Sequence, residues 1–141
     1  MNSEPGRHFE RSFPNQLAEL SRVAEEAGRF LRERGVGAQA VYTANLAIEE
    51  LATNVLKYGY DDAAAHELLL RLELQSGALL LVLEDDGHEF NPLLAPEPDL
   101  TQPANQRAPG GLGLYLVRKL AGQMTYERRG LRNRLTVRIR L

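Results

Sequence analysis

The residues best placed to do chemistry in this chain are Glu50 and Asn54. Both stand in the stretch Val41 to Tyr60, where apolar residues recur at steps of three and four, the period of an amphipathic helix. A spacing of four stacks the carboxylate and the carboxamide on one helical face. Such a pair could hold a hydrated Mg²⁺, and Glu50 could accept a proton. The same pattern also fits two ordinary polar positions at the edge of a core helix.

A second candidate group is Asp85-Asp86-Gly87, directly after a predicted strand. A carboxylate at a strand end can accept a hydrogen bond from an amine of a ligand. Glycine lets the backbone approach a flat ring closely, or adopt a positive φ. A simple β-turn would use the same three residues.

The third candidate is the glycine segment Gly110-Gly111-x-Gly113, which opens a predicted helix. Backbone N–H groups at a helix N-terminus can bind an anion. A flexible loop closing onto a helix would also contain such glycines. The segment is neither a Walker motif nor a Rossmann fingerprint, because no Gly-Lys-Ser/Thr occurs and the glycines follow a proline-rich loop instead of a strand.

Composition restricts the class of protein. The 141 residues suit one domain that buries roughly two-thirds of its unfolded surface. A net charge of −2 argues against nucleic-acid binding by phosphate neutralisation, and the arginines crowding the C-terminus fit a solvated face. No cysteine is present, no signal peptide appears, and no apolar run approaches the ~20 residues that span a bilayer. We therefore expect a cytoplasmic protein with no membrane or direct nucleic-acid contact.

The elements that must position these groups follow from periodicity and turn residues. Predicted strands cover 8–13, 67–75, 78–84, 124–128 and 135–141, and predicted helices cover 16–34, 38–59 and 112–123. This order predicts an α+β fold, a two-layer sandwich with a mixed, mostly antiparallel sheet and helices on one face. Residues 91–110 contain five prolines and no period, which favours a mobile lid within a single domain.

Together, the three candidate groups resemble the GHKL ATPase superfamily. They are E-L-A-T-N on a helix, D-D-G-x-x-F after a strand and G-G-L-G-L entering a helix. The double acidic Glu49-Glu50, the phrase N-V-L-K-Y-G-Y and the phrase G-G-L-G-L-Y-L-V-R-K-L are most similar to the stand-alone anti-sigma factor serine/threonine kinases of this superfamily. The resemblance extends from Phe9 to Leu141 and implies the GHKL, histidine-kinase-like ATPase fold.

The resemblance also implies ATP and Mg²⁺ as cofactors and assigns roles to matching residues. Asn54 matches the asparagine that binds Mg²⁺, and Glu50 matches the general base that acts on the acceptor hydroxyl. Asp85 matches the aspartate that accepts a hydrogen bond from the adenine amino group, with Gly87 beside it.

The glycine box, from Gly111 through Leu112 and Gly113 to Leu114, matches the backbone that contacts the phosphates. Further positions that the resemblance brings towards the nucleotide are Lys57, Tyr58 and Arg107. Arg107 is the nearest basic candidate in the lid, since Ala108 and Pro109 stand where related kinases can carry a basic residue.

Two functions follow from the resemblance. In the first, the protein is an ATP-dependent anti-sigma factor and serine/threonine protein kinase that phosphorylates a STAS-type anti-anti-sigma antagonist and sequesters a sigma factor. In the second, it is an ATP-binding partner-switching module with little or no kinase activity. The resemblance also allows a homodimer.

A third hypothesis, a detached histidine-kinase catalytic domain, has less support, because no helix bearing a phosphoacceptor histidine precedes the candidate groups. The histidines at 8, 66 and 88 lack paired spacing and are interpreted as surface or turn residues.

Overall fold

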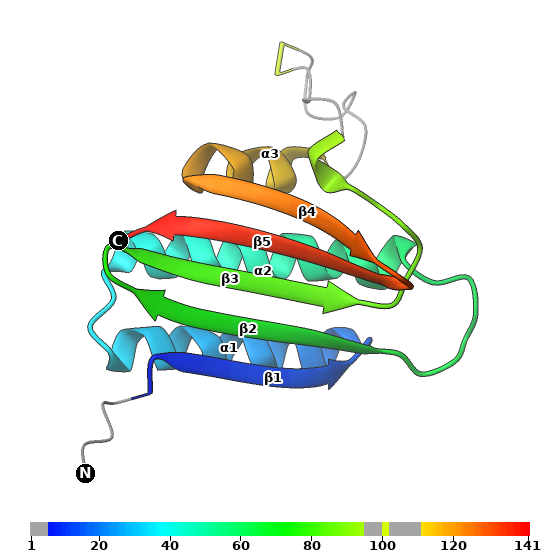
Figure 1. Cartoon of the computed structure of the whole chain (residues 1–141), viewed down its shortest axis with the longest axis horizontal. Coiled ribbons are helices and arrows are strands. Elements are labelled where there is room, and N and C mark those ends of the chain that lie inside the picture. The colour runs from blue at the N-terminus through cyan, green and yellow to red at the C-terminus, as the bar shows by residue number, and fades with distance from the viewer. Residues whose placement is uncertain (1–5, 95–99, 102–110) are drawn as a thin grey trace.

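The computed structural model describes residues 6–94, 100–101 and 111–141. Its elements in chain order are strand β1 (His8–Pro14), helices α1 (Leu17–Glu33) and α2 (Ala38–Tyr58), strands β2 (Glu67–Gln75) and β3 (Ala78–Asp85), the short 3-10 helix η1 (Pro92–Leu94), helix α3 (Gly111–Leu120), and strands β4 (Gln123–Arg129) and β5 (Arg132–Arg140). The strands form one five-stranded sheet in the order β1-β2-β3-β5-β4 (Figure 1).

All four strand pairings are antiparallel, and β3 lies between β2 and β5 at the centre of the sheet. The register of β3 against β5 places Asp85, the last residue of β3, opposite Asn133. A one-residue slip would move every side chain to the other face, so the buried leucines of both strands also determine where these two polar residues point.

One face of the sheet packs against the helices and holds the core. Along β3, Leu79, Leu81 and Leu83 are buried. Side chains alternate between the faces of a strand, so Asp85 continues this series and also points towards the helix layer. A carboxylate is thereby placed among buried side chains.

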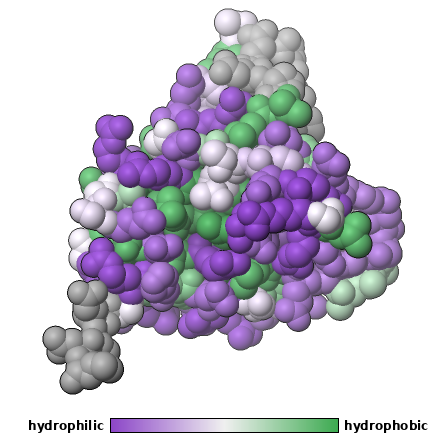
Figure 2. All heavy atoms as spheres, in the orientation of Figure 1, coloured by the Kyte–Doolittle hydropathy of each residue, from purple (hydrophilic) through white to green (hydrophobic). Residues whose placement is uncertain are grey.

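The other face is open and carries many charged side chains (Figure 2). Glu84 accepts hydrogen bonds there from Arg71 on β2 (3.0 Å) and from Arg134 on β5 (2.9 Å). Some of the C-terminal arginines therefore pair with this carboxylate and belong to a charged sheet face.

Helix α2 lies between α1 and α3 behind the sheet (Figure 1). Its buried apolar stripe includes Val41, Ala44, Ile48 and Leu51, as the periodicity predicts. Asn54, on the C-terminal half of the same helix, lines a cavity together with Asp85, the residue at which β3 ends.

The expected fold is confirmed, with differences in detail. The sheet that was expected to be mixed is antiparallel in all four pairings. The expected hairpin turns at Gly77 and Gly130 are present, and both glycines adopt positive φ angles of 77° and 57°. Helix α3 ends at Leu120, three residues earlier than expected, because residues 121–122 form a bend into a β4 that begins at Gln123.

One further boundary differs, and one short element was not expected. Strand β5 begins at Arg132, three residues earlier than expected, and Pro92–Leu94 form a 3-10 helix where no regular structure was expected. Most of the expected lid, namely 95–99 and 102–110, lies outside the described residues. Within the described residues, no helix is long and apolar enough to cross a membrane.

Candidate functional site

A cavity of about 160 Å³ lies where the C-terminal half of α2 meets the ends of β3, β4 and β5. Its apolar lining comes from α2, β3 and β5 and includes Leu51, Val55, Leu83 and Leu135. Its polar lining includes Asn54, Asp85 and Asn133. An apolar pocket with a few converging polar groups is the usual form of a small-molecule site.

Asp85 is the buried carboxylate of this cavity and is only 4% exposed. Its Oδ1 atom accepts hydrogen bonds from the backbone N–H of Gly87 (2.8 Å) and from Nδ2 of Asn133 (2.9 Å). Burial raises the pKa of the Asp85 carboxyl, although both hydrogen bonds act to lower it. No described residue donates a hydrogen bond to Oδ2, which is the oxygen left to accept one from a ligand.

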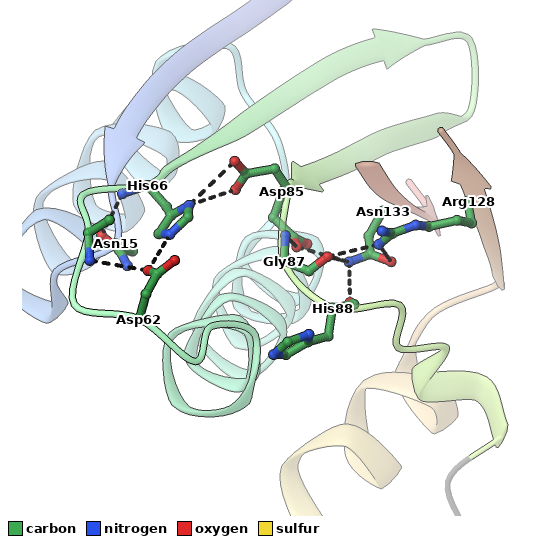
Figure 3. Close-up of polar contacts among 10 residues, drawn as sticks. Asn15, Asp62, His66, Asp85, Gly87, His88, Arg128 and Asn133 are labelled. Atoms are coloured by element: carbon green, nitrogen blue, oxygen red, sulfur yellow. Dashed lines mark hydrogen bonds and ion pairs between the residues drawn. The ribbon is translucent and has the colours of Figure 1, made fainter. Parts of the chain in front are cut away.

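Asn133 is a site residue that the sequence analysis missed. Its Nδ2 donates to Asp85 Oδ1 and to the carbonyl of His88 (2.7 Å), and its Oδ1 accepts from Arg128 (3.1 Å) (Figure 3). The same Oδ1 also accepts from the Tyr126 hydroxyl (2.5 Å). The available signal was a polar residue at a core-facing position of β5, two residues before Leu135. The strand was expected to start at Leu135, so Asn133 was placed in the preceding turn and was not considered as a core-facing residue.

Gly87 is required here for a close backbone approach. A Cβ atom at this position would lie 2.6 Å from the carbonyl oxygen of Gly59, at the end of α2. The next residue, His88, donates its N–H to that same carbonyl (2.8 Å). The φ angle of Gly87 is not positive, and the Asp85 side chain closes an Asx turn by accepting from the Gly87 N–H. The turn interpretation is thus correct for the backbone, and it leaves one Asp85 carboxylate oxygen without a hydrogen bond from any described residue.

Glu50 and Asn54 lie on the part of α2 that faces α3 and the cavity. Asn54 lines the cavity. Glu50, one helical turn earlier, contacts α3, and its carboxylate lies so close to Gly113 that a Cβ atom there would overlap it. The fold thus brings Glu50 against the first turn of α3, which contains the glycine box.

The remaining predicted residues are distributed unevenly. Tyr58 lines the cavity, whereas Lys57 is exposed and is not among the described residues that line it. Leu112 is exposed, and Leu114 packs in the core at 6% exposure, so only its backbone could contact a ligand. Gly111 is the first residue of α3, and Arg107 lies outside the described residues.

No cluster of three or more His, Cys, Asp or Glu side chains that could hold a metal ion occurs among the described residues. A cation at this site would therefore need ligands from a bound molecule or from water in addition to protein side chains.

Known proteins share both the sequence pattern and the fold. A family model described as the histidine kinase-like ATPase domain (HATPase_c_2) matches residues 13–139. The serine/threonine-protein kinase BtrW of Bordetella bronchiseptica is 28% identical over 107 residues, which are 76% of this chain and 75% of that protein.

Among solved structures, the histidine kinase domain from the blue-light activated histidine kinase EL346 of Erythrobacter litoralis superimposes with a TM-score of 0.56 at 22% identity. The match covers 88% of this chain and 60% of that chain, and at this identity it is a likeness of fold. Because the family model spans nearly all of the sequence, the chain belongs to the histidine kinase-like ATPase domain family.

Proposed function

We propose that this protein is an ATP-dependent serine/threonine protein kinase of the anti-sigma factor type. The observation that carries the proposal is buried Asp85, which lines a small cavity together with Asn54 of α2 and whose Oδ2 accepts no hydrogen bond from a described residue. Membership of an ATPase domain family supports ATP as the ligand, and the similarity to a serine/threonine-protein kinase supports transfer to a hydroxyl.

The cavity suits the base of the nucleotide. Its volume of about 160 Å³ is below the roughly 300–1,000 Å³ that is typical of sites for whole drug-sized ligands. A flat adenine ring would fit between the apolar side chains of α2 and β5. Its amino group would donate to Asp85 Oδ2, and the ribose and phosphates would extend outside this cavity.

The described residues fit Mg²⁺ only together with a bound nucleotide. Asn54 would supply a carboxamide oxygen, and phosphate oxygens and water would supply the other ligands, since Mg²⁺ requires near-octahedral oxygen coordination. When bound, the ion would neutralise negative charge on the phosphates.

Glu50 would act as the general base. It would accept the proton from a serine or threonine hydroxyl as the hydroxyl oxygen bonds to the γ-phosphorus and the bond from that phosphorus to the leaving ADP oxygen breaks. The contact with Gly113 would hold the carboxylate against the glycine box, in the first turn of α3. Residues 91–110 would close over the phosphates as a lid.

The proposed protein substrate is a STAS-type anti-anti-sigma antagonist, with a sigma factor as the second partner. This part of the proposal is supported by the sequence resemblance and by the 28% identity to a serine/threonine-protein kinase. A second function, an ATP-gated binding module without kinase activity, is favoured by Ala108-Pro109 directly before the glycine box, where a basic residue would assist transfer.

Transfer of labelled phosphate from ATP to a STAS-type protein encoded near this gene tests the proposal. We expect Glu50→Gln to bind ATP nearly normally and to lose roughly 10²–10⁴-fold in transfer rate, the usual contribution of a general base. The matched control is Glu49→Gln, which changes an exposed neighbouring carboxylate on the same helix. Transfer by Glu50→Gln at the wild-type rate would remove Glu50 from the mechanism. A wild type that needs ATP to hold a partner but transfers no phosphate would favour the binding module.

A further inference from the structure

A second polar cluster lies beside the Asp85 turn, where the loop between α2 and β2 meets the residues that follow β3. His66, from this loop, places Nε2 at 2.7 Å from Asp62 Oδ1 and Nδ1 at 3.3 Å from Asp86 Oδ1. Figure 3 shows the imidazole between Asp62 on its own loop and the end of β3. One histidine therefore bridges two carboxylates on different segments.

The surroundings hold this imidazole firmly. Its side chain is 18% exposed and stacks on the ring of Tyr60, with ring centroids 4.1 Å apart and planes 12° apart. The His66 backbone N–H donates to Asn15 Oδ1 (3.2 Å), and the Asn15 N–H donates to the His66 carbonyl (2.9 Å). A second pair between the same two segments, His88 with Asp61 at 2.9 Å, is 51% and 87% exposed and contributes little.

The bridge through His66 requires a protonated ring. A neutral imidazole has one N–H donor and one acceptor, so it can donate to only one of two carboxylates. When the proton is lost, one carboxylate faces a nitrogen lone pair. The contact with Asp86 is the longer of the two and is the one that should open.

The Asp86 contact is connected through the backbone to the cavity that Asp85 lines. Asp86 directly follows Asp85, and the next two residues contact the Gly59 carbonyl, one by close approach and one by a hydrogen bond. Gly59, Asp85 and His88 all line the cavity. The loop that carries His66 therefore packs against the turn that contains Asp85, and it contacts this turn at Asp86, Gly87 and His88.

We propose that His66 is a positioning residue for the nucleotide base: its protonated ring ties Asp86 to the α2–β2 loop and holds the Asp85 turn in its binding geometry. Loss of the proton releases this tie and weakens nucleotide binding. The inference rests on the proposed function, because it takes the cavity to be the base site.

The charges around the ring agree with this direction. The titratable and charged groups that face His66 or its immediate neighbours are Tyr60, Asp62, Asp86, Asp85, His88 and Arg132. The hydrogen bond with Asp62, and then that with Asp86, raises the pKa of His66. A raised pKa means that the stabilisation is fully present below the ordinary value of about 6.5 and is lost as pH rises through the folded-state pKa.

Calorimetric titration of the full chain with ADP from about pH 6 to about pH 8.5, a range that brackets the ordinary histidine pKa, tests the inference. The variants are His66→Gln, which cannot bridge two carboxylates, and Asp86→Asn, whose amide can donate to a neutral Nδ1. His8→Gln is the control, since His8 is exposed on β1. Dividing each variant affinity by the wild-type affinity at the same pH cancels the titration of the ADP phosphates.

We expect wild type to bind ADP roughly two- to five-fold more tightly than His66→Gln at the acid end, the size of one partly exposed ion pair, and equally at the alkaline end. Asp86→Asn should retain binding with a flatter pH profile, and His8→Gln should follow wild type. NMR titration without nucleotide should give His66 a pKa above its ordinary value of about 6.5, and Asp86→Asn should lower this pKa.

Three results would overturn the inference. A ratio of wild-type to His66→Gln affinity that does not change with pH would overturn this inference and leave the proposed function standing. A His66 pKa that is unaffected by Asp86→Asn would do the same, and it can be measured even if His66→Gln does not fold. Absence of ADP binding by wild type at every pH would overturn the proposed function as well.

Discussion

The Glu50 carboxylate and the Cα of Gly113 are packed together so closely that no side chain could stand at position 113 without moving Glu50. The two residues lie on α2 and α3, and this contact joins the candidate general base to the glycine box at the start of α3. Glycine is an unfavourable residue inside a helix, so its presence here is explained by the space that the carboxylate needs.

This relationship predicts a strong coupling between the two positions. Gly113→Ala should destabilise the protein by roughly 1–3 kcal/mol, because the added methyl group overpacks the contact. In a Glu50→Ala background the same substitution should stabilise by up to about 1 kcal/mol, since alanine is the better helix former. Urea unfolding of the four proteins measures this cycle.

Gly37→Ala serves as the comparison for that cycle, because a Cβ atom at Gly37 would meet nothing within 4 Å. Additive effects of the substitutions at 50 and 113 would contradict the contact.

Asp85→Asn should weaken nucleotide binding while keeping the hydrogen bonds that stabilise the turn. The asparagine keeps an oxygen for the Gly87 and Asn133 donors, but it replaces the free acceptor with a donor. We expect ATP binding to weaken by about 1–3 kcal/mol, the cost of an unpaired buried polar group. Calorimetry on the variant and on Glu67→Gln, an exposed carboxylate, measures the difference.

Wild type should also prefer ATP to GTP, because the carbonyl of guanine would face the Asp85 carboxylate. Equal affinities for the two nucleotides would contradict the assignment of the base site.

Asp85→Asn also has a predicted pH signature without nucleotide. Burial raises the pKa of Asp85, so the folded protein holds this proton at pH values where the unfolded chain has lost it. Wild-type stability relative to Asp85→Asn should therefore be highest below the unfolded pKa of about 3.9 and should fall as pH rises through the folded pKa. Urea unfolding across this range would contradict the raised pKa if the difference grew with pH.

Asn133 should be needed for both the fold and the site. Asn133→Ala removes the amide that donates to Asp85 and to the His88 carbonyl, so Asp85 keeps only the Gly87 N–H and the His88 carbonyl loses this donor. A loss of about 1–3 kcal/mol of unfolding free energy per unpaired group is expected.

Asn133→Asp places a second carboxylate beside Asp85. The stability of this variant relative to wild type should therefore fall between about pH 4 and pH 7, where carboxyls ionise. Thermal unfolding at both pH values measures this, and a pH-independent deficit would contradict direct contact between the two side chains.

Asn54→Ala tests the cation separately from the base. Asn54 lines the cavity without making a hydrogen bond to another described side chain, so the variant should keep its fold. We expect weaker binding of ATP in the presence of Mg²⁺ and little change when the ion is removed by a chelator, because the carboxamide would act through the metal. Equal losses in both conditions would place Asn54 against the nucleotide itself.

Much of the fold could be predicted from local patterns. The richly apolar runs of β2 and β3 predict strands of a sheet that helices cover, and glycines at 77 and 130 predict the hairpins, because both signals lie within a few residues of sequence. Local patterns also predicted that Glu50 and Asn54 lie one turn apart on the same helix. They predicted as well that Asp85 lies at the end of a strand.

Tertiary structure alone decided how these groups meet. Asn133 lies 48 positions after Asp85 in the sequence and contacts it because β5 pairs with β3 in one particular register. This register cannot be predicted from a local sequence pattern. Glu50 meets Gly113 because two helices pack side by side, and His66 meets Asp86 because a loop folds back on a strand end. Such contacts depend on how the whole core packs, since the burial of many apolar side chains chooses the register and the helix positions together.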